Sequence, residues 1–331
     1  MLNCRSMIHT RKLGIWALAA LLPAQEIEPV FRGGVEIVTV SFSVIAPNGN
    51  FIQGLKKENF ALYDNGLQAP IAQFWQDTGI PLTIALVADI SGSQRAVVQK
   101  HKRSMGQFLQ QVLGSEDKAL LAIIDAQVRL AEDFTNSKDD LQSSVDKLLV
   151  HRIPTTRLGD PCVSERPRAT RSRFPCGGSV IWNGVFYTAR LKMKAPEGRK
   201  AMVLLTDGED SGSNHSLTTA IEAAQGADMI VFPIQEPANG HRIAPKSKKR
   251  LGRLAQETGG ILFDGTKQSP QQIFDQIERE LRSQYVLAFT PPERSRDGKF
   301  HKLEVKIKNI KNQAHPGLKV RCRSGYYAPN N

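Results

Sequence analysis

The chain has 331 residues, of which 40% are hydrophobic and 23% charged, so it can bury at least one sizeable core and is predicted to fold. Its formal net charge of +12 would suit an anionic partner, but charge alone concerns association and solubility. The sequence carries no zinc finger, RNA-binding aromatic strand or helix-turn-helix motif, so we do not expect it to bind nucleic acid.

The first 24 residues have the order of a secretory signal peptide. Arg5, Arg11 and Lys12 precede an apolar run over residues 13–22, which is too short for a comfortable membrane span. We therefore predict export to the periplasm or the extracellular space. The alternative is an uncleaved signal that anchors the chain, and we expect membrane association only in that case.

Residues 29–78 are predicted to form strands only. A β-branched, partly alternating run over 35–44 ends at a turn over 47–50, and shorter strands are expected at 61–66 and 71–75. Helical patterns do not begin until after this block.

From residue 79 to residue 284, apolar strands alternate with helices. Residues 82–88 are a continuous apolar run that ends at Asp89, as expected for a strand buried on both faces of a parallel sheet. The other expected strands are 119–124, 201–205, 229–232 and 261–263, with an edge strand at 127–134. The expected helices cover 98–112, 179–191, 217–226 and 250–258, and two more start at Ser137 and Ser269. This alternation predicts an α/β domain with a doubly wound, mostly parallel sheet.

Strands return in residues 285–331, at 285–289, 302–307 and 318–323. A short β block at each end of the chain cannot easily build its own core. We therefore expect residues 29–78 and 285–331 to pair as one flanking β-sandwich built from both termini.

Three polar loops are expected at one edge of the α/β sheet. Asp89, Ser91 and Ser93 follow the first buried strand, Ser179 begins a helix, and Asp207 follows another buried strand. In open α/β sheets, ligands bind outside the carboxyl ends of the strands. These oxygen-bearing side chains are therefore predicted to converge.

The three loops resemble the metal-ion-dependent adhesion site (MIDAS) of von Willebrand factor A domains: Asp-x-Ser-x-Ser, a Gly-Gly-Thr-like loop and Leu-Thr-Asp-Gly. The resemblance covers about residues 81–289, and the flanking segments 54–60, 63–66, 284–287 and 323–327 are similar to bacterial exported proteins of the VWFA-related type. It implies that the metal ligands are Asp89, Ser91, Ser93, Ser179 and Asp207. The family usually has threonine where this chain has Ser179, and the freer χ1 of serine affects the ligand geometry.

The chemistry of these side chains agrees with that implication. Hydroxyl and carboxylate oxygens are hard ligands that suit Mg²⁺, Mn²⁺ or Ca²⁺ rather than zinc. With only two charged ligands, the ion can accept a further carboxylate, so we expect a protein or peptide ligand that supplies an acidic side chain. The alternative is that Asp89 and the serines only cap the following helix.

Three functions remain open at this point. The preferred one is non-enzymatic, metal-dependent binding, and the second is a structural or assembly subunit of an envelope complex. A metal-assisted hydrolase is the least expected, because no obvious general base accompanies the ligands.

Several other residues carry weaker expectations. Cys162 and Cys176 flank an Arg-rich loop and are a disulfide candidate in an oxidising compartment, whereas Cys322 is expected to be a half-buried strand thiol. The possible partner-contact residues of that loop are Arg166, Arg168, Arg171 and Arg173, with a solvated insertion as the alternative. The seven histidines lack metal-ligand spacing and are expected at the surface, and Glu209 and Asp210 are expected to be solvated loop acids.

Overall fold

The computed structural model describes residues 37–76, 80–91, 94–148, 156–158, 179–237, 242–291, 297–308 and 317–328. The strands of its central sheet are β5 (Leu82–Asp89), β6 (Lys118–Ile124), β7 (Val128–Thr135), β8 (Thr156–Arg157), β9 (Arg199–Thr206), β10 (Met229–Gln235) and β11 (Phe263–Asp264). The helices are α1 (Arg95–Val112), α2 (Lys138–Lys147), α3 (Ile181–Tyr187), α4 (Leu217–Gly226), α5 (Pro245–Thr258) and α6 (Pro270–Arg282), with a π-helix, η2 (Thr188–Met193), directly after α3.

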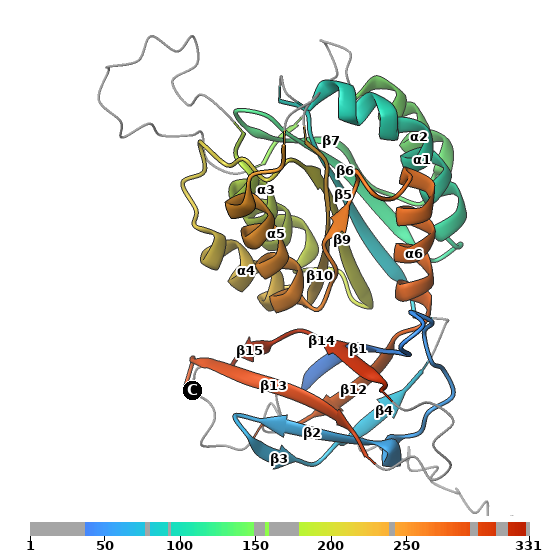
Figure 1. Ribbon diagram of the computed structural model, residues 1–331, viewed down its shortest axis with the longest axis vertical. Helices are drawn as coiled ribbons and strands as arrows, with labels where there is room; N and C mark the ends of the chain where they lie inside the picture. The colour runs from blue at the N-terminus through green and yellow to red at the C-terminus, as the bar shows by residue number, and fades with distance from the viewer. Residues whose placement is uncertain are drawn as a thin grey trace, which may run out of the picture. The chain divides into compact units, whose positions relative to one another are not determined.

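The seven strands of this sheet lie in the order β11-β10-β9-β5-β6-β7-β8 (Figure 1). All neighbouring pairs are parallel except β6–β7 and β7–β8. The chain moves outward from β5 through β6 and β7 on one side, and from β9 through β10 and β11 on the other. The strand order therefore reverses between β5 and β9, which is where open α/β sheets bind their ligands.

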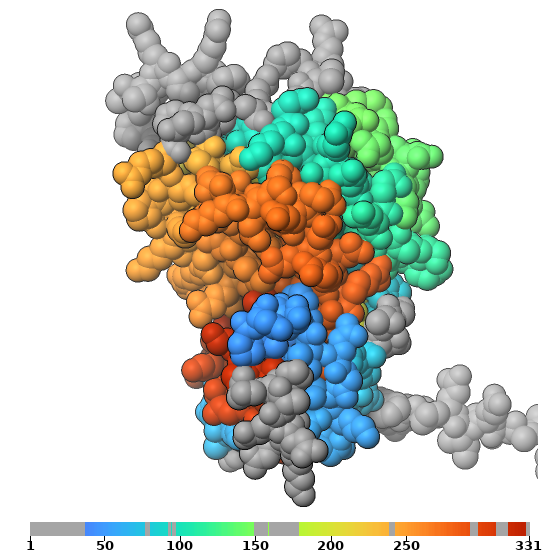
Figure 2. All heavy atoms as spheres, turned by 45° about the vertical axis from the view of Figure 1, so that its right-hand side comes forward, coloured from blue at the N-terminus to red at the C-terminus, as the bar shows by residue number. Residues whose placement is uncertain are grey.

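Helices cover both faces of the sheet, with α1, α2 and α6 on one side and α3, α4 and α5 on the other (Figure 1). Along β5 the side chains alternate between two cores: Leu82, Ile84, Leu86 and Ala88 join one, and Ala85 and Val87 the other. The surface in Figure 2 shows the orange segment that contains α6 beside blue-green α1, which it contacts. Because both faces are buried, the central strands β5, β6 and β10 are mostly apolar rather than alternating.

A second body of strands comes from the two ends of the described chain. Its strands are β1 (Val38–Ile45), β2 (Phe60–Asp64), β3 (Leu67–Ala69), β4 (Gln73–Trp75), β12 (Tyr285–Phe289), β13 (Phe300–Ile307), β14 (Lys319–Cys322) and β15 (Gly325–Tyr327), with a 3₁₀ turn, η1, over Lys57–Asn59. They form two antiparallel sheets, β14-β1-β12-β4 and β15-β13-β2-β3. Aromatic rings pack in its core. The ring centroid of Phe42 lies 4.9 Å from that of Phe60 and 5.4 Å from that of Tyr285. The predicted pairing of both termini in one sandwich is confirmed.

Local signals located most element boundaries. The Ser137 hydroxyl accepts a hydrogen bond from the Asp140 amide at the start of α2, and Ser269 forms a capping box with Gln272 at the start of α6. The expected start of the 250–258 helix was wrong, because α5 begins at Pro245 without a side-chain cap. The π-helical continuation of α3 and the short strand β15 were not predicted either. Cys322 lies half-buried in β14.

The surface histidine expectation also fails for two residues. His101 on α1 and His301 on β13 are both buried, the latter between Asp64 and Asp297 at 2.9 and 3.3 Å. Each has a carboxylate partner from a distant part of the chain, Glu236 for His101 and Asp64 for His301, which spacing in the sequence does not reveal. Within the described residues, no helix is long and apolar enough to cross a bilayer.

Asp117 anchors the edge of the sheet opposite the predicted site. This buried carboxylate accepts hydrogen bonds from the amides of Leu82 (2.7 Å) and Gly114 (2.8 Å) and from Arg282 (2.7 Å). Burial alone would raise the pKa of Asp117, but these hydrogen bonds and the charge of Arg282 outweigh it and lower that pKa below its usual 3.8. Asp117 therefore joins the start of β5 to the end of α6.

We predict that Asp117→Asn lowers the free energy of unfolding at pH 7 by about 2 to 3 kcal/mol, since an amide cannot accept all three bonds. A lowered folded-state pKa means that the wild-type carboxylate contributes fully above pH 3.8 and loses its contribution as the pH falls through the folded-state value. Urea unfolding from pH 7 to pH 2.5 should thus show the difference shrinking on acidification. The exposed neighbour variant Glu116→Gln is the control, and equal stability losses for both variants would contradict the assignment.

Candidate metal site

Three segments meet at the carboxyl edge of the sheet between β5 and β9. Asp89 is the last residue of β5 and is 0% exposed. Ser179 lies two residues before α3 and is also buried, and Asp207 directly follows β9. The predicted convergence of these side chains is therefore present in the fold.

Asp89 is the centre of a small hydrogen-bond network. Its Oδ2 accepts from the Ser179 hydroxyl at 2.8 Å and from the Thr206 hydroxyl at 3.0 Å. Its Oδ1 accepts from the Ser91 amide at 3.0 Å. The network brings a hydroxyl from the Ser179 loop and one from the end of β9 onto one carboxylate. Thr206 was not assigned a role from the sequence, although its place at the end of a buried strand beside Asp207 was a usable signal.

The charge on Asp89 is poorly compensated in the protein alone. Burial raises the pKa of Asp89, and the nearby charge of Asp207 raises it further, against the lowering effect of hydrogen bonds from Ser91 and Ser179. A buried carboxylate with a second carboxylate nearby favours a cation between or beside them.

The second carboxylate is held by its own set of donors. Gln94 Nε2 donates to Asp207 Oδ2 at 3.0 Å, and the Glu209 amide donates to Oδ1 at 2.9 Å. The loop then turns at Gly208, whose φ of +82° favours glycine, and a Cβ there would lie 2.8 Å from Leu251 Cδ1. The position of Asp207 thus depends on close packing between its loop and α5.

A polar column supports this edge, formed by the N-cap residue of α1, two side chains of α1 and Glu236. Gln94 donates to the Glu236 carbonyl at 3.4 Å as well as to Asp207. His101 Nε2 lies 2.6 Å from Glu236 Oε2, and Lys100 Nζ lies 2.5 Å from Oε1. Burial would raise the pKa of Glu236, but hydrogen bonds from His101 and Lys100 lower it. Sequence reasoning missed this column because its partners are more than a hundred residues apart.

Asp210 differs from the expectation of a solvated loop acid. It is partly buried, and its Oδ1 accepts from the Trp182 amide at 3.2 Å and from the Ser213 hydroxyl at 2.5 Å. Its backbone forms a parallel bridge with Ser179. Burial raises the pKa of Asp210, opposed by these hydrogen bonds and by the charge of Arg250. Asp210 therefore fixes the Ser179 loop to the start of α3.

Glu209 is exposed, as expected, and accepts from the Ser247 hydroxyl at 2.8 Å.

The other predicted residues fall outside the described part of the chain. Ser93 does, as do Cys162, Cys176 and the four arginines between them, so the place of Ser93, the disulfide and the partner-contact loop stay predictions, as does the ligand role of all five residues. Among the described residues, no group of three or more His, Cys, Asp or Glu side chains could hold a metal ion. The candidate site therefore depends on hydroxyl oxygens beside its two carboxylates.

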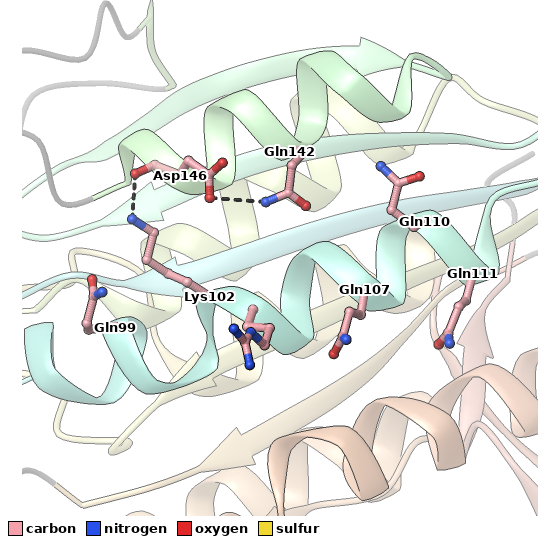
Figure 3. Close-up of a pocket in the computed structure, with 8 residues that line it drawn as sticks. Gln99, Lys102, Gln107, Gln110, Gln111, Gln142 and Asp146 are labelled. Atoms are coloured by element: carbon pink, nitrogen blue, oxygen red, sulfur yellow. Dashed lines mark hydrogen bonds between the residues drawn. The ribbon is translucent and has the colours of Figure 1, made fainter.

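A hollow elsewhere on the α/β domain holds none of the candidate ligands. It is a polar groove of about 570 Å³ between α1 and α2, rich in glutamine (Figure 3). Within it, Gln142 donates to Asp146 Oδ1 and Lys102 to the Asp146 carbonyl. Gly106 leaves room for the Gln142 amide, which a Cβ would meet at 2.1 Å. The groove is accounted for by the packing of these two helices.

No protein-family model matches the sequence, and no curated protein matches it either. Among solved structures, the chain is similar to an aerotolerance-related membrane protein from Bacteroides fragilis, with 17% identity, a TM-score of 0.42, and coverage of 61% of this chain and 98% of that one. It is also similar to proximal thread matrix protein 1 from the mussel byssus, solved with a zinc-occupied MIDAS motif, with 16% identity, a TM-score of 0.46, and coverage of 66% and 50%. A third likeness is to the PilB minor pilin from Streptococcus sanguinis, with 14% identity, a TM-score of 0.42, and coverage of 62% of each chain.

These likenesses concern the fold, and the chain spans about half the length of the mussel protein. The expected α/β fold with a doubly wound, mostly parallel sheet is confirmed by the strand order itself, with its parallel centre, antiparallel edge and two helical layers.

We predict that Asp89→Asn removes metal binding without harming the metal-free fold. The amide keeps the shape, its oxygen can accept from the Ser91 amide, and the hydroxyls of Ser179 and Thr206 can rotate to accept from its NH₂. The free energy of unfolding without metal should change by less than about 1 kcal/mol. Binding is measured from the loss of the free Mn²⁺ electron paramagnetic resonance signal, with Glu209→Gln as a control in the same edge. A variant that binds Mn²⁺ as tightly as wild type would rule out Asp89 as a ligand.

Proposed function

We propose that residues 79–284 form a non-enzymatic binding module that holds a divalent cation and captures a protein or peptide through an acidic side chain. The observation that carries this proposal is the meeting of Asp89, Ser179 and Asp207 at the point where the strand order reverses. Asp89, Ser91, Ser93, Ser179 and Asp207 are the proposed ligands of the ion.

The donor set fits a hard cation. It offers two carboxylates and several hydroxyls, without thiolate or imidazole, and therefore suits Mg²⁺, Mn²⁺ or Ca²⁺. A bound cation would also balance the charge of the buried Asp89, which burial and Asp207 otherwise disfavour. When bound, the ion supplies an electrophilic position for an incoming carboxylate.

Binding is favoured over hydrolysis by the state of the neighbouring acids. Glu236 is engaged by His101 and Lys100, and Asp210 accepts from Trp182 and Ser213. A general base must be able to reach and accept a proton from a water molecule. These two acids instead serve as hydrogen-bond acceptors that hold the loops. An exported protein with this site would meet its ligand in the periplasm or outside the cell.

We predict that divalent cations stabilise the folded protein. If the ion binds only the native state, a concentration a hundred times its dissociation constant adds about 2.7 kcal/mol to the free energy of unfolding. Chemical unfolding of chelator-treated protein, with and without Mg²⁺, Mn²⁺ or Ca²⁺, measures this gain. Unfolding curves that none of the three ions moves would remove the metal from the proposal.

Capture of the ligand should depend on the ion as well. We expect protein retained from an envelope extract in Mg²⁺ to be released by chelator, and Asp89→Asn and Asp207→Asn to retain none of it, because both carboxylates serve one ion. Folding of each variant is checked by circular dichroism. If folded variants without metal still retain the partner at full strength, the ion has a structural role in an assembly subunit instead.

A further inference from the structure

Arg250 is placed over an aromatic ring beside the candidate metal site. It lies in the second turn of α5, and its guanidinium carbon is 4.7 Å from the ring centroid of Trp182. Trp182 is the second residue of α3 and is 1% exposed, whereas Arg250 is partly exposed. The stacking is a cation–π contact, which orients the guanidinium while leaving its N–H edge able to donate.

This pair is connected to the metal edge by short contacts. The Trp182 amide donates to Asp210, Asp210 pairs with Ser179 through the backbone, and the Ser179 hydroxyl donates to Asp89. On α5, one turn before Arg250, Ser247 donates to Glu209 in the loop that begins with Asp207. The first two turns of α5 therefore border the same loops that supply the proposed ligands.

The cations of α5 are not equivalent. Two of them are ion-paired: Lys248 Nζ lies 3.6 Å from Asp264 Oδ2, and Arg253 Nε lies 2.6 Å from Glu257 Oε1. Within the described residues, neither Arg250 nor Lys246 has a carboxylate at ion-pair distance. Asp210 is near enough to attract Arg250, but its Oδ1 already accepts from the Trp182 amide and the Ser213 hydroxyl.

Lys246 extends the same flank of the helix toward the sheet edge. It is exposed and lies four residues before Arg250, so the two side chains share one face of α5. An oriented guanidinium with free N–H groups matches a carboxylate in the bidentate geometry that arginine prefers, and a neighbouring ammonium adds charge to the same place.

We propose that Arg250, stacked on Trp182 and assisted by Lys246, is a second anchor that binds a second carboxylate of the ligand. The inference rests on the proposed function, in which a first carboxylate reaches the metal. The ligand class is therefore a peptide segment with two acidic residues at a fixed spacing. Loss of the second carboxylate weakens binding about 10- to 100-fold, the range for a hydrogen-bonded charged pair.

The test is selection of displayed random dodecapeptides on immobilised protein in Mg²⁺, with elution by chelator. Wild type should enrich peptides with two acidic positions at constant spacing. Arg250→Gln should enrich peptides with only one, and Arg250→Lys, which keeps the charge without the fork, should weaken the second preference. Arg253→Gln, on the same flank but paired with Glu257, is the matched control and should select as wild type does.

Affinities of one enriched peptide then complete a double-mutant cycle. Replacing its second acid by the matching amide should cost wild type about 10- to 100-fold and cost Arg250→Gln almost nothing. Thermal unfolding checks that each variant is folded. If Arg250→Gln does not fold, the same cycle is measured with Lys246→Gln, whose side chain is exposed. An absence of chelator-eluted peptides overturns the proposed function and this inference with it. Chelator-eluted peptides with one acidic position, or with a second one that Arg250 and Lys246 variants leave unchanged, overturn this inference alone.

Discussion

The carboxylate of Asp89 terminates a strand that is buried along its whole length, and a charge in that place must be compensated. Donors from separate parts of the chain do so only in part: the Ser91 amide, the Ser179 hydroxyl and the Thr206 hydroxyl. Ser91 and Ser179 lie in separate loops, and Thr206 is the last residue of β9 before a third. The conformations of the loops are therefore linked through one buried side chain, and the surface that they present depends on it.

The sheet topology explains why this happens between β5 and β9. The connections after these neighbouring strands lead to opposite faces, so their carboxyl ends are left without a crossing chain. The surrounding helices then contribute one support each: the N-cap of α1 supplies Gln94 to Asp207, α3 supplies the Trp182 amide to Asp210, and α5 supplies Ser247 to Glu209. A site built on such supports is held by rigid elements, which favours binding of a ligand with a defined geometry.

The acids of this edge fall into two groups that the charge count alone does not separate. Glu236 and Asp210 accept from protein donors that hold the loops, whereas the pKa of Asp89 is raised by its burial and by the nearby charge of Asp207. Among the cations, Arg250 is held by an uncharged partner, because the ring of Trp182 orients its guanidinium without neutralising its charge. In a chain with a net charge of +12, it is the partner of each charge, rather than its sign, that indicates function.

The sequence by itself determined most of the strands and helices, because burial on two faces requires apolar runs such as 82–88, and because caps such as Ser137 and Ser269 act on their own turns. It also indicated Asp89 and Asp207, since polar residues at the ends of parallel buried strands lie at one edge, and Ser179, which precedes a helix at that edge. Only the tertiary structure decided the partners: Thr206 on Asp89, His101 on Glu236, and Arg250 on Trp182. These contacts join residues 68 to 135 positions apart, and local propensity and periodicity carry no information about which distant side chains packing will bring together.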